Sequence, residues 1–439
     1  MSTGAGTSQK ATRTMGEERA ADTLPGDLTM TRRLWPLLLA SAVGLLPFTV
    51  FSTYLVPIAD ESGSSVAAMG GLRGLGGLAA LLAGTALAPL IDRVPREWAA
   101  AGGLGVLAVS TALGASGEYL LLVAFCLLVG AGTAVLNPAL TAAAADRFGT
   151  GKAASRAATL VTATQSMTAM LAAPVIALPA VLWGWEGDLL AVSAVSLLLA
   201  VVLLARRAPS GTAADEEADG GGKLSYLASF KALAAMRGVV PLLLISLLRT
   251  AVFMGYLAYL AAYYDSRFQL DPGLFSLVWT LSGASFFVSN LCTGRLTNSA
   301  QPGVHTEHLL VLGLLAALAS VVGFYFTHWL PLALVLTSLH AASHAVVAAC
   351  AVSLLVRRCG TLRGSALSIN AAGMSLGVFV GAALGGLGLG LAGYPGVALV
   401  FGTLTAVALG AAFLVSRRSG GTDGGEGDGS SEAGTSDAV

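Results

Sequence analysis

Twelve runs of mostly apolar residues, each about 20 residues long, constrain this chain more than any other feature. A helix rises ~1.5 Å per residue, so such a run can cross the ~30 Å hydrocarbon core of a bilayer. Lipid offers backbone N–H and C=O groups no partner, so each run must be helical. The predicted spans are residues 34–57, 66–91, 97–116, 119–143, 155–181, 188–205, 239–262, 273–296, 308–327, 330–356, 364–392 and 396–416.

The composition agrees with a membrane protein. Hydrophobic residues make up 55% of the chain and charged residues 11%, against roughly 25% charged in soluble domains. The zero net charge and scattered basic residues argue against a nucleic-acid partner. Cys126, Cys292 and Cys350 lie in apolar runs and Cys359 in a short loop, without disulfide or CxxC spacing. We therefore expect neither a metal nor a cofactor.

The positions of basic residues predict the orientation, because Lys and Arg accumulate on the cytoplasmic side. All but three of the 24 Lys and Arg residues fall on the side shared by both termini. The exceptions are Arg267 on the other side, and Arg73 and Arg249 within spans. The apolar run after Arg32 and Arg33 is too long for a signal peptide. We expect a multi-pass plasma-membrane protein with both termini in the cytoplasm.

The chain divides into two halves of similar length, joined by a polar, Gly-rich linker. Its tails contain too little apolar surface to fold. The predicted regions are a disordered cytoplasmic tail at 1–32, a six-helix bundle at 33–206, a linker at 207–238, a second six-helix bundle at 239–418 and a disordered acidic tail at 419–439.

The end of the linker carries apolar residues at three-residue steps, namely Leu224, Leu227, Phe230 and Leu233. This pattern predicts a short amphipathic helix at the cytoplasmic surface of the membrane. A plain loop is the alternative.

The loop between the second and third predicted spans carries Asp92, Arg93 and Arg96, with Ala88 and Pro95 at the flanking positions. This loop resembles the signature G-x-x-x-D-R-x-G-R of the major facilitator superfamily, with Ala88 and Pro95 in place of its two glycines. After the eighth span, Gly294, Arg295 and Asn298 repeat part of the pattern. A simple basic cytoplasmic loop is the alternative interpretation.

The resemblance implies an all-α polytopic membrane protein of twelve transmembrane helices in two pseudo-symmetric six-helix bundles. It also implies a monomeric secondary transporter that binds a small-molecule substrate and works by alternating access. In the family this loop braces the cytoplasmic helix ends. The residues to which the resemblance assigns that role are Asp92, Arg93, Arg96, Arg295 and Asn298.

The fifth span contains Ala169, Ala173 and Pro174, and the segment Trp183-Gly184-Trp185 follows it. The small residues resemble, in degenerate form, the Gly/Pro signature of the family's antiporter branch, and the Trp-Gly-Trp segment follows as in many drug exporters. Small residues permit close helix approach. Ordinary small-residue packing is the alternative. The fourth span departs from the exporter pattern, because Cys126 stands where that pattern has an arginine.

The acidic residues all fall in loops, tails or span ends, so a proton-coupled mechanism would need another titratable group within the spans. His340 and His344 lie on one face of the tenth span, and His340 is near the membrane midplane. Arg249 has a similar depth in the seventh span. By the resemblance, these spans line one water-filled cavity, so Arg249 would bind a polar or anionic substrate group. Hydrogen bonding that only fixes helix packing is the alternative.

Further candidate substrate-binding residues are Tyr256, Arg73, Gln165 and Asn370. Tyr256 adds a hydroxyl to the seventh span. Arg73 is closer to the outer surface and could instead extend its guanidinium to the interface. Gln165 and Asn370 occupy corresponding places in the two halves, where interhelical hydrogen bonding is the alternative role.

The sequence does not match the zinc-protease or phosphate-loop motifs of enzymes. The segment HAASH lacks the glutamate of a zinc-protease helix, and GTGKAAS lacks the first glycine and the Ser/Thr of a phosphate loop. Ser285 with His340 leaves an intramembrane protease as a remote alternative, beside a membrane receptor. We therefore predict a transporter that exports a drug or metabolite, with uptake of an organic anion as the second hypothesis. Protons are the candidate coupling ion.

Overall fold

The computed structural model of the chain describes residues 26–91, 94–149, 152–206, 226–236, 238–298 and 305–417. Every regular element in these ranges is a helix, as the apolar runs predict. The elements are α2 (Asp27–Val43), α3 (Leu46–Thr53), α4 (Leu55–Glu61), α5 (Val66–Ile91), α6 (Arg96–Gly114), α7 (Tyr119–Asp146), α8 (Lys152–Ala205), α9 (Tyr226–Ala235), α10 (Val239–Phe268), α11 (Pro272–Asn298), α12 (Thr306–Phe326), α13 (Leu330–Cys359), η1 (Gly360–Leu362) and α14 (Arg363–Arg417).

Nine helices of the described part are long and apolar enough to cross a membrane. Two of them, α8 and α14, each contain two predicted spans that meet at non-helical residues, Gly184 in α8 and Ala392–Gly393 in α14. The third predicted span is α6, and the first is divided into α2, α3 and α4. Each of the twelve predicted spans therefore coincides with helical structure.

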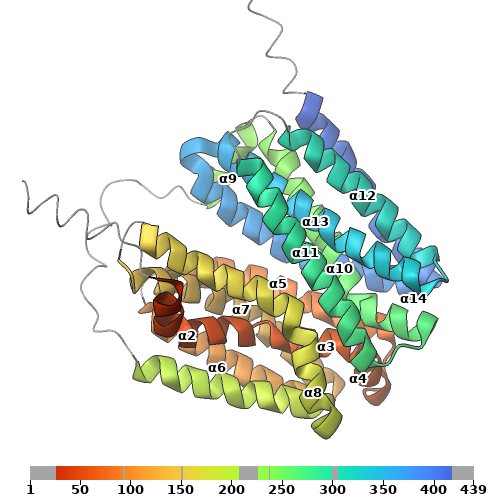
Figure 1. The fold of residues 1–439 in the computed structure, drawn as a ribbon, viewed down its shortest axis with the longest axis horizontal. Helices are drawn as coiled ribbons and strands as arrows, with labels where there is room; N and C mark the ends of the chain where they lie inside the picture. Colours follow the sequence, from red (N-terminus) through yellow and green to blue (C-terminus); the bar gives the residue numbers. More distant parts are fainter. Residues whose placement is uncertain are drawn as a thin grey trace, which may run out of the picture.

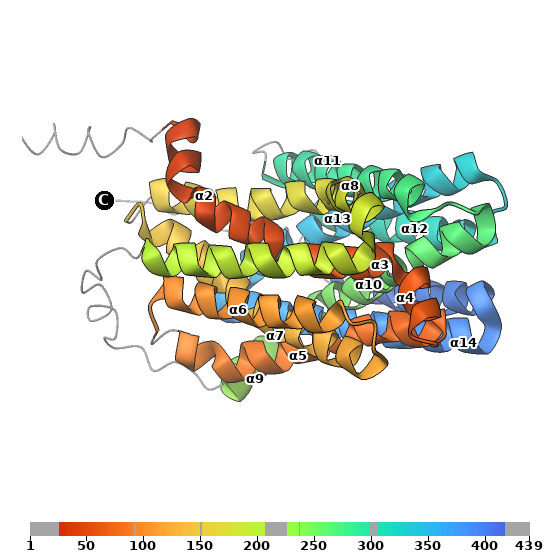
Figure 2. The same cartoon turned by 90° about the horizontal axis from the view of Figure 1, so that it is seen from below.

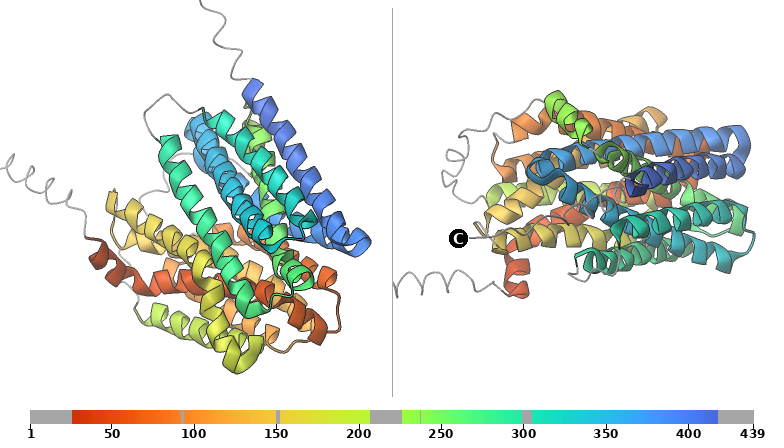
Figure 3. Two further views of the ribbon diagram at one scale, coloured as in Figure 1. Left: turned by 45° about the vertical axis from the view of Figure 1, so that its right-hand side comes forward. Right: turned by 90° about the horizontal axis from the view of Figure 1, so that it is seen from above.

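The helices form two bundles, α2–α8 and α10–α14 (Figure 1). We call the end of the molecule where α2 begins, α8 ends and α10 begins the linker end, and the opposite end the far end. The helices run side by side between these two ends (Figure 2). The bundles approach each other at the far end and separate toward the linker end, and the same division is visible from two other directions (Figure 3).

The turn between α10 and α11 shows how the sequence ends and restarts a helix at the far end. Gln269 adopts a left-handed conformation, with φ 55°, and ends α10. Asp271 then accepts hydrogen bonds from the backbone N–H groups of Gly273 and Leu274, at 2.8 and 3.1 Å, so the first turn of α11 is capped.

Within each bundle, glycines bring helix backbones into contact. A Cβ atom at Gly130 of α7 would lie 2.0 Å from the carbonyl oxygen of Gly76 in α5. The second bundle has an equivalent contact, because a Cβ at Gly381 of α14 would lie 1.9 Å from the carbonyl oxygen of Ala251 in α10. Helices surrounded by lipid associate through such close packing, so these positions hold each bundle together.

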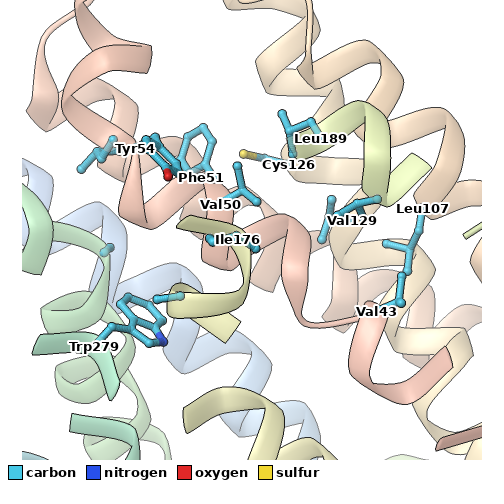
Figure 4. Close-up of a cluster of buried hydrophobic side chains, with 14 of the residues drawn as sticks. Val43, Val50, Phe51, Tyr54, Leu107, Cys126, Val129, Ile176, Leu189 and Trp279 are labelled. Atoms are coloured by element: carbon cyan, nitrogen blue, oxygen red, sulfur yellow. The ribbon is translucent and has the colours of Figure 1, made fainter. Parts of the chain in front are cut away.

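Contacts between the bundles involve the far halves of their helices. In α5, Gly74 faces Phe379 of α14, and Gly77 faces Ser375. Trp279 of α11 donates a hydrogen bond from Nε1 to the carbonyl oxygen of Ala169 in α8, at 3.1 Å. Figure 4 shows the Trp279 ring beside the α8 segment. The structure is therefore closed at the far end.

The linker helix α9 packs against the second bundle. Leu233 is buried there in a cluster with Val239 and Leu242 at the start of α10. Of the apolar residues that predict an amphipathic helix, Leu224 lies outside the described residues. The buried Leu233 shows that this helix rests on protein through at least part of its apolar face.

Candidate functional site

Arg249 lies in the interior of the second bundle, 5% exposed, about one third of the way along α10. Its Nη2 donates to Thr250 Oγ1 at 3.1 Å, whereas its Nε has no hydrogen-bond partner. The guanidinium lies close enough to His344 of α13 for their charges to interact. A permanently charged group is thus held inside the bundle with part of its donor capacity unused.

His340 and His344 lie one turn apart on α13, with ring centroids separated by 4.4 Å. His340 is fully buried, and its Nδ1 is 3.0 Å from Ser320 Oγ of α12. The Phe253 ring of α10 stacks on His344 at 5.3 Å between centroids. Arg249 and the two histidines, predicted to face one water-filled cavity, lie instead in an enclosed cluster between α10, α12 and α13, where they are 5%, 0% and 1% exposed.

Four nitrogen atoms of this cluster are buried without a partner: Arg249 Nε, His340 Nε2, and both ring nitrogens of His344. Buried polar atoms are normally hydrogen-bonded, because leaving one unpaired costs ~1–3 kcal/mol. The group is therefore suited to receive an acceptor such as a carboxylate, phosphate or carbonyl oxygen, or ordered water. We call Arg249, His340 and His344 the basic cluster.

Tyr256 borders the basic cluster through its ring, whose centroid is 4.4 Å from that of His340. Its hydroxyl is 2.8 Å from Thr337 Oγ1 of α13, and the Tyr264 hydroxyl is 2.9 Å from the same oxygen. Both tyrosines are fully buried. Here Tyr256 closes one side of the cluster with an aromatic face.

Arg73 lies on α5, at the boundary between the bundles. It is 8% exposed, and its Nη1 donates to the carbonyl oxygen of Met254 in α10 at 3.4 Å. Its guanidinium lies over the Phe48 ring, 5.9 Å from the centroid. Because this side chain is enclosed by protein, it does not extend to the membrane interface.

Gln165 and Asn370 have different surroundings, although they occupy corresponding places in the two halves. Gln165 Nε2 donates to Asn137 Oδ1 of α7 at 3.1 Å, an interhelical hydrogen bond. Asn370 is buried near Met374 Sδ, and its Oδ1 has no partner. Asn370 therefore retains a free acceptor, whereas Gln165 has an amide partner.

The residues assigned to the conformational brace are only partly described. Asp92 and Arg93 lie outside the described residues, as does the Asn298 side chain. Arg96 begins α6 and Arg295 is exposed near the end of α11. Among the other described contacts at the linker end of the second bundle, Arg358 pairs with Glu307 at 3.3 Å and Arg357 donates to the Thr297 carbonyl oxygen.

The small residues of the fifth span lie where α8 meets its neighbours. The backbone of Ala169 faces Gly283 of α11, where a Cβ would lie 3.0 Å from the Ala169 carbonyl oxygen. Ala173 is fully buried and Pro174 half-buried within the helix. Ala169 thus supports a contact between the two bundles.

The sequence did not single out Asp188, which it placed at the first position of the sixth span. The structure buries this carboxyl group, 2% exposed, and neither oxygen has a hydrogen-bond partner.

The described residues contain no cluster of three or more His, Cys, Asp or Glu side chains that could hold a metal ion. Ser285 bonds the Leu281 carbonyl oxygen of its own helix, while His340 faces Ser320.

The arrangement matches known proteins in fold. The bacterial homolog to the human lysosomal transporter Spinster, in an inward-facing and occupied conformation, has a TM-score of 0.69 at 15% identity, covering 90% of this chain and 98% of its own. The nucleoside transporter NupG has a TM-score of 0.70 at 14% identity, covering 88% and 98%. The human organic anion transporter MFSD10 (TETRAN) has a TM-score of 0.57 at 20% identity, covering 88% and 99%.

No curated protein matches the chain. The family model of the Major Facilitator Superfamily, by contrast, matches residues 37–361, which is well over half of its length. The matched range begins in α2 and ends in the turn after α13, so it includes helices of both bundles. The chain therefore belongs to the Major Facilitator Superfamily, and it is a multi-pass membrane transporter of a small molecule rather than an enzyme.

Proposed function

We propose that this protein is a secondary active transporter that exports a small organic molecule by alternating access, and that the basic cluster binds a polar group of the substrate. The observation that carries the proposal is the set of four unpartnered, buried nitrogens on Arg249, His340 and His344. Intramembrane ionisable residues are costly and mark functional sites by default. A substrate with an acidic or carbonyl group would accept hydrogen bonds from Arg249 Nε and from the N–H groups of the imidazoles.

Arg249 is the anchor of this site. Its guanidinium stays protonated at any physiological pH, so burial cannot be relieved by loss of a proton. Its described neighbours are Thr250 and His344, and its Nε has no hydrogen-bonding partner. A carboxylate or a phosphate group would accept hydrogen bonds from the N–H groups of this guanidinium.

Export is the proposed direction of transport. The bundles touch in their far halves and separate toward the linker end. The distribution of basic residues favours a cytoplasmic linker end in the plasma membrane. In this state an exporting monomer would load its substrate from the cytoplasm, whereas an importing one would release it there. The small residues Ala169, Ala173 and Pro174 of α8 are consistent with the exporter branch.

Uptake of an organic anion is the second candidate function. It is favoured by Arg249, which has no described carboxylate partner, and by Arg73, a second buried cation at the bundle boundary. The human organic anion transporter among the solved structures shares this fold. Tyr256, Gln165 and Asn370 would add polar contacts to either kind of substrate. The direction of transport distinguishes the two candidates.

Protons are the proposed coupling ion, and the two histidines of the basic cluster are the proposed carriers. His340 already has one partner, Ser320, whereas both nitrogens of His344 are unpaired. The conformational brace would stabilise one state of the cycle through Asp92, Arg93, Arg96, Arg295 and Asn298.

The test is transport into and out of proteoliposomes containing the purified protein, with a panel of anionic and cationic organic solutes and imposed pH gradients. For the solute that moves, Arg249→Ala is expected to lower transport about tenfold or more. Arg267→Ala, which removes an exposed arginine at the far end, is the matched control and is expected to retain transport. Full transport by Arg249→Ala would refute the site.

The coupling ion is tested in the same vesicles. Substrate accumulation by the parent protein is expected to follow the pH gradient, and His344→Gln is expected to lose this dependence. Accumulation that ignores the gradient in the parent protein would exclude the histidine-coupling proposal. Outward accumulation supports export, whereas inward accumulation of an anion supports the second candidate.

A further inference from the structure

A buried carboxyl group in the first bundle is separate from the basic cluster. Asp188 lies one turn after Gly184, where α8 is interrupted by a residue with φ 68°. Its side chain is 2% exposed, and neither carboxyl oxygen has a hydrogen-bond partner. An ionised carboxylate without a partner in such surroundings is strongly disfavoured, and burial normally leaves the group neutral. Burial without a partner therefore favours the neutral, protonated form of Asp188 in this conformation.

The ionisable neighbour of Asp188 is Tyr54, whose hydroxyl is close enough for their charges to interact. Tyr54 is the non-helical residue between α3 and α4. Figure 4 shows it in the apolar core beside Phe51, with Leu189 in the same cluster. The carboxyl group is thus placed between two helix interruptions, one at Gly184 and one at Tyr54.

Other acidic groups nearby are directed elsewhere. Glu61, at the end of α4, accepts a hydrogen bond from Trp185 Nε1 at 3.2 Å and is exposed. Glu186 of the same turn as Asp188 folds back toward Gly184. A Cβ at Gly114 of α6 would lie 2.7 Å from Phe125 of α7 and 3.3 Å from Leu189, so apolar groups pack beside the residue that follows Asp188. The Cys126 thiol of α7 belongs to the same cluster as Leu189.

The oxygen atoms at Asp188 and Tyr54 suit the binding of a proton better than that of a metal ion. Divalent cations such as Ca²⁺ and Mg²⁺ take about six or more oxygen ligands. Asp188 and Tyr54 together offer three oxygens, and no larger group of metal-ligating side chains occurs in the described residues. A single carboxylate becomes neutral on binding one proton and needs no further ligands.

The first span connects this carboxyl group to the contact between the bundles. Helix α3 packs against α8, and both α3 and α4 pack against α10. Helix α10 carries Tyr259, whose hydroxyl donates to the Ala382 carbonyl oxygen at 2.6 Å and lies 3.5 Å from that of Ala67 in the first bundle. The Tyr54 interruption therefore lies on the segment that contacts both α8, which carries Asp188, and α10 of the second bundle.

We propose that Asp188 is a proton-binding site of this transporter, neutral while the far end is closed and ionised once the far end opens and water reaches it. The proposal rests on the alternating-access function proposed above and adds a proton carrier in the first bundle. The O–H bond of the carboxyl group breaks and the proton passes to water. Low pH therefore favours the closed far end, and a single site changes this equilibrium by at most about tenfold per pH unit.

The protonation state can be measured without a substrate. Infrared spectra of the full chain in liposomes, titrated between acidic and alkaline pH, are expected to show a carboxylic-acid C=O band that disappears as pH rises. This band is expected to be missing from Asp188→Asn and retained in Glu186→Gln, the matched control on the same helix turn. A titrating band that persists in Asp188→Asn would overturn the proposal.

The linkage to far-end closure is measured with spin labels on the two bundles. Leu120 at the start of α7 and Leu274 at the start of α11 are exposed far-end positions, 78% and 52%. They are replaced by Cys in a Cys292→Ser background, because Cys126, Cys350 and Cys359 are buried. The parent protein and Glu186→Gln are expected to shift from the short to the long distance as pH rises.

Asp188→Asn is expected to remain at the short distance at every pH. An unchanged pH response in Asp188→Asn would refute the linkage. Failure of this variant to fold would also contradict the proposal, because Asn has nearly the shape of the neutral carboxyl group. Neither measurement uses a transported solute. The proposal for Asp188 can therefore be tested even if the Arg249 test fails.

Discussion

Arg73 of the first bundle donates a hydrogen bond from Nη1 to the carbonyl oxygen of Met254 in the second bundle, at 3.4 Å. The Phe48 ring lies under the same guanidinium. A buried cation therefore crosses the boundary along which the two bundles must separate for the far end to open. Arg73 has to exchange this partner for water or for a substrate in the open state.

Arg73→Met keeps the length of the side chain and removes its charge. A hydrogen bond from a charged donor contributes ~1.5–3 kcal/mol, so the ratio of closed to open molecules is expected to fall by about tenfold or more. Spin-label distances between Leu120→Cys and Leu274→Cys measure this change. Arg267→Met, at an exposed far-end position, is the control. A distance distribution in Arg73→Met equal to that of the control would show that Arg73 does not hold the bundles together.

Gly130→Ala is expected to destabilise the first bundle. The new methyl group would lie 2.0 Å from the Gly76 carbonyl oxygen, and only a separation of α5 and α7 can relieve this clash. Overpacking of this kind costs ~1–3 kcal/mol. Thermal unfolding in detergent is expected to show a lower midpoint. Gly105→Ala, which meets nothing within 4 Å, is expected to leave the midpoint unchanged or raise it. Equal midpoints for the two variants would contradict the packing argument.

Tyr256 and Tyr264 share one partner, the hydroxyl of Thr337. Removing either phenol leaves Thr337 with the other, so each Tyr→Phe change is expected to cost about 1 kcal/mol or less. The double variant leaves a buried hydroxyl without either phenol, so its cost is expected to exceed the sum of the single costs. Unfolding of the four proteins in a denaturant series measures the coupling. Additive costs would show that Thr337 finds another partner.

The orientation predicted from charge can be tested on one helix. Leu120 and Asp146 lie near opposite ends of α7, and both side chains are exposed. In a Cys292→Ser background, an impermeant maleimide applied to intact cells is expected to label Leu120→Cys and not Asp146→Cys. The reverse pattern would place the linker end outside the cell. Permeabilised cells provide the control, since both positions then react.

Much of the fold follows from sequence, because lipid forces each apolar run into a helix. The two predicted boundaries at residues 181–188 and 392–396 coincide with the interruptions at Gly184 and Gly393. The first span was predicted as one helix, and the structure divides it near Gly44 and Tyr54. Pro47 lies in the first turn of α3, but the interruption depends on how α3 packs against α8, which hydropathy does not record.

The site was less accessible to sequence reasoning. Depth along a span indicated that Arg249 and the histidines lie at comparable levels, and they do form one cluster. Ser320, which faces His340, comes from a helix that no motif singled out. Asp188 was missed because a carboxylate at a span end ordinarily reaches water. Its burial arises from tertiary packing around Leu189 and Tyr54, for which a single sequence gives no signal.

The interruption at Gly184 joins two spans with very different surroundings. The half of α8 before it contacts the second bundle through Ala169, whereas the half after it exposes Leu197 and Leu198 on the outer surface. With so short a connection, the tilt of one half restricts the tilt of the other. Bilayer thickness sets the preferred tilt of a lipid-facing span. Bilayer thickness therefore affects the conformation of this protein, and lipids of different chain length are expected to change the ratio of its open and closed states.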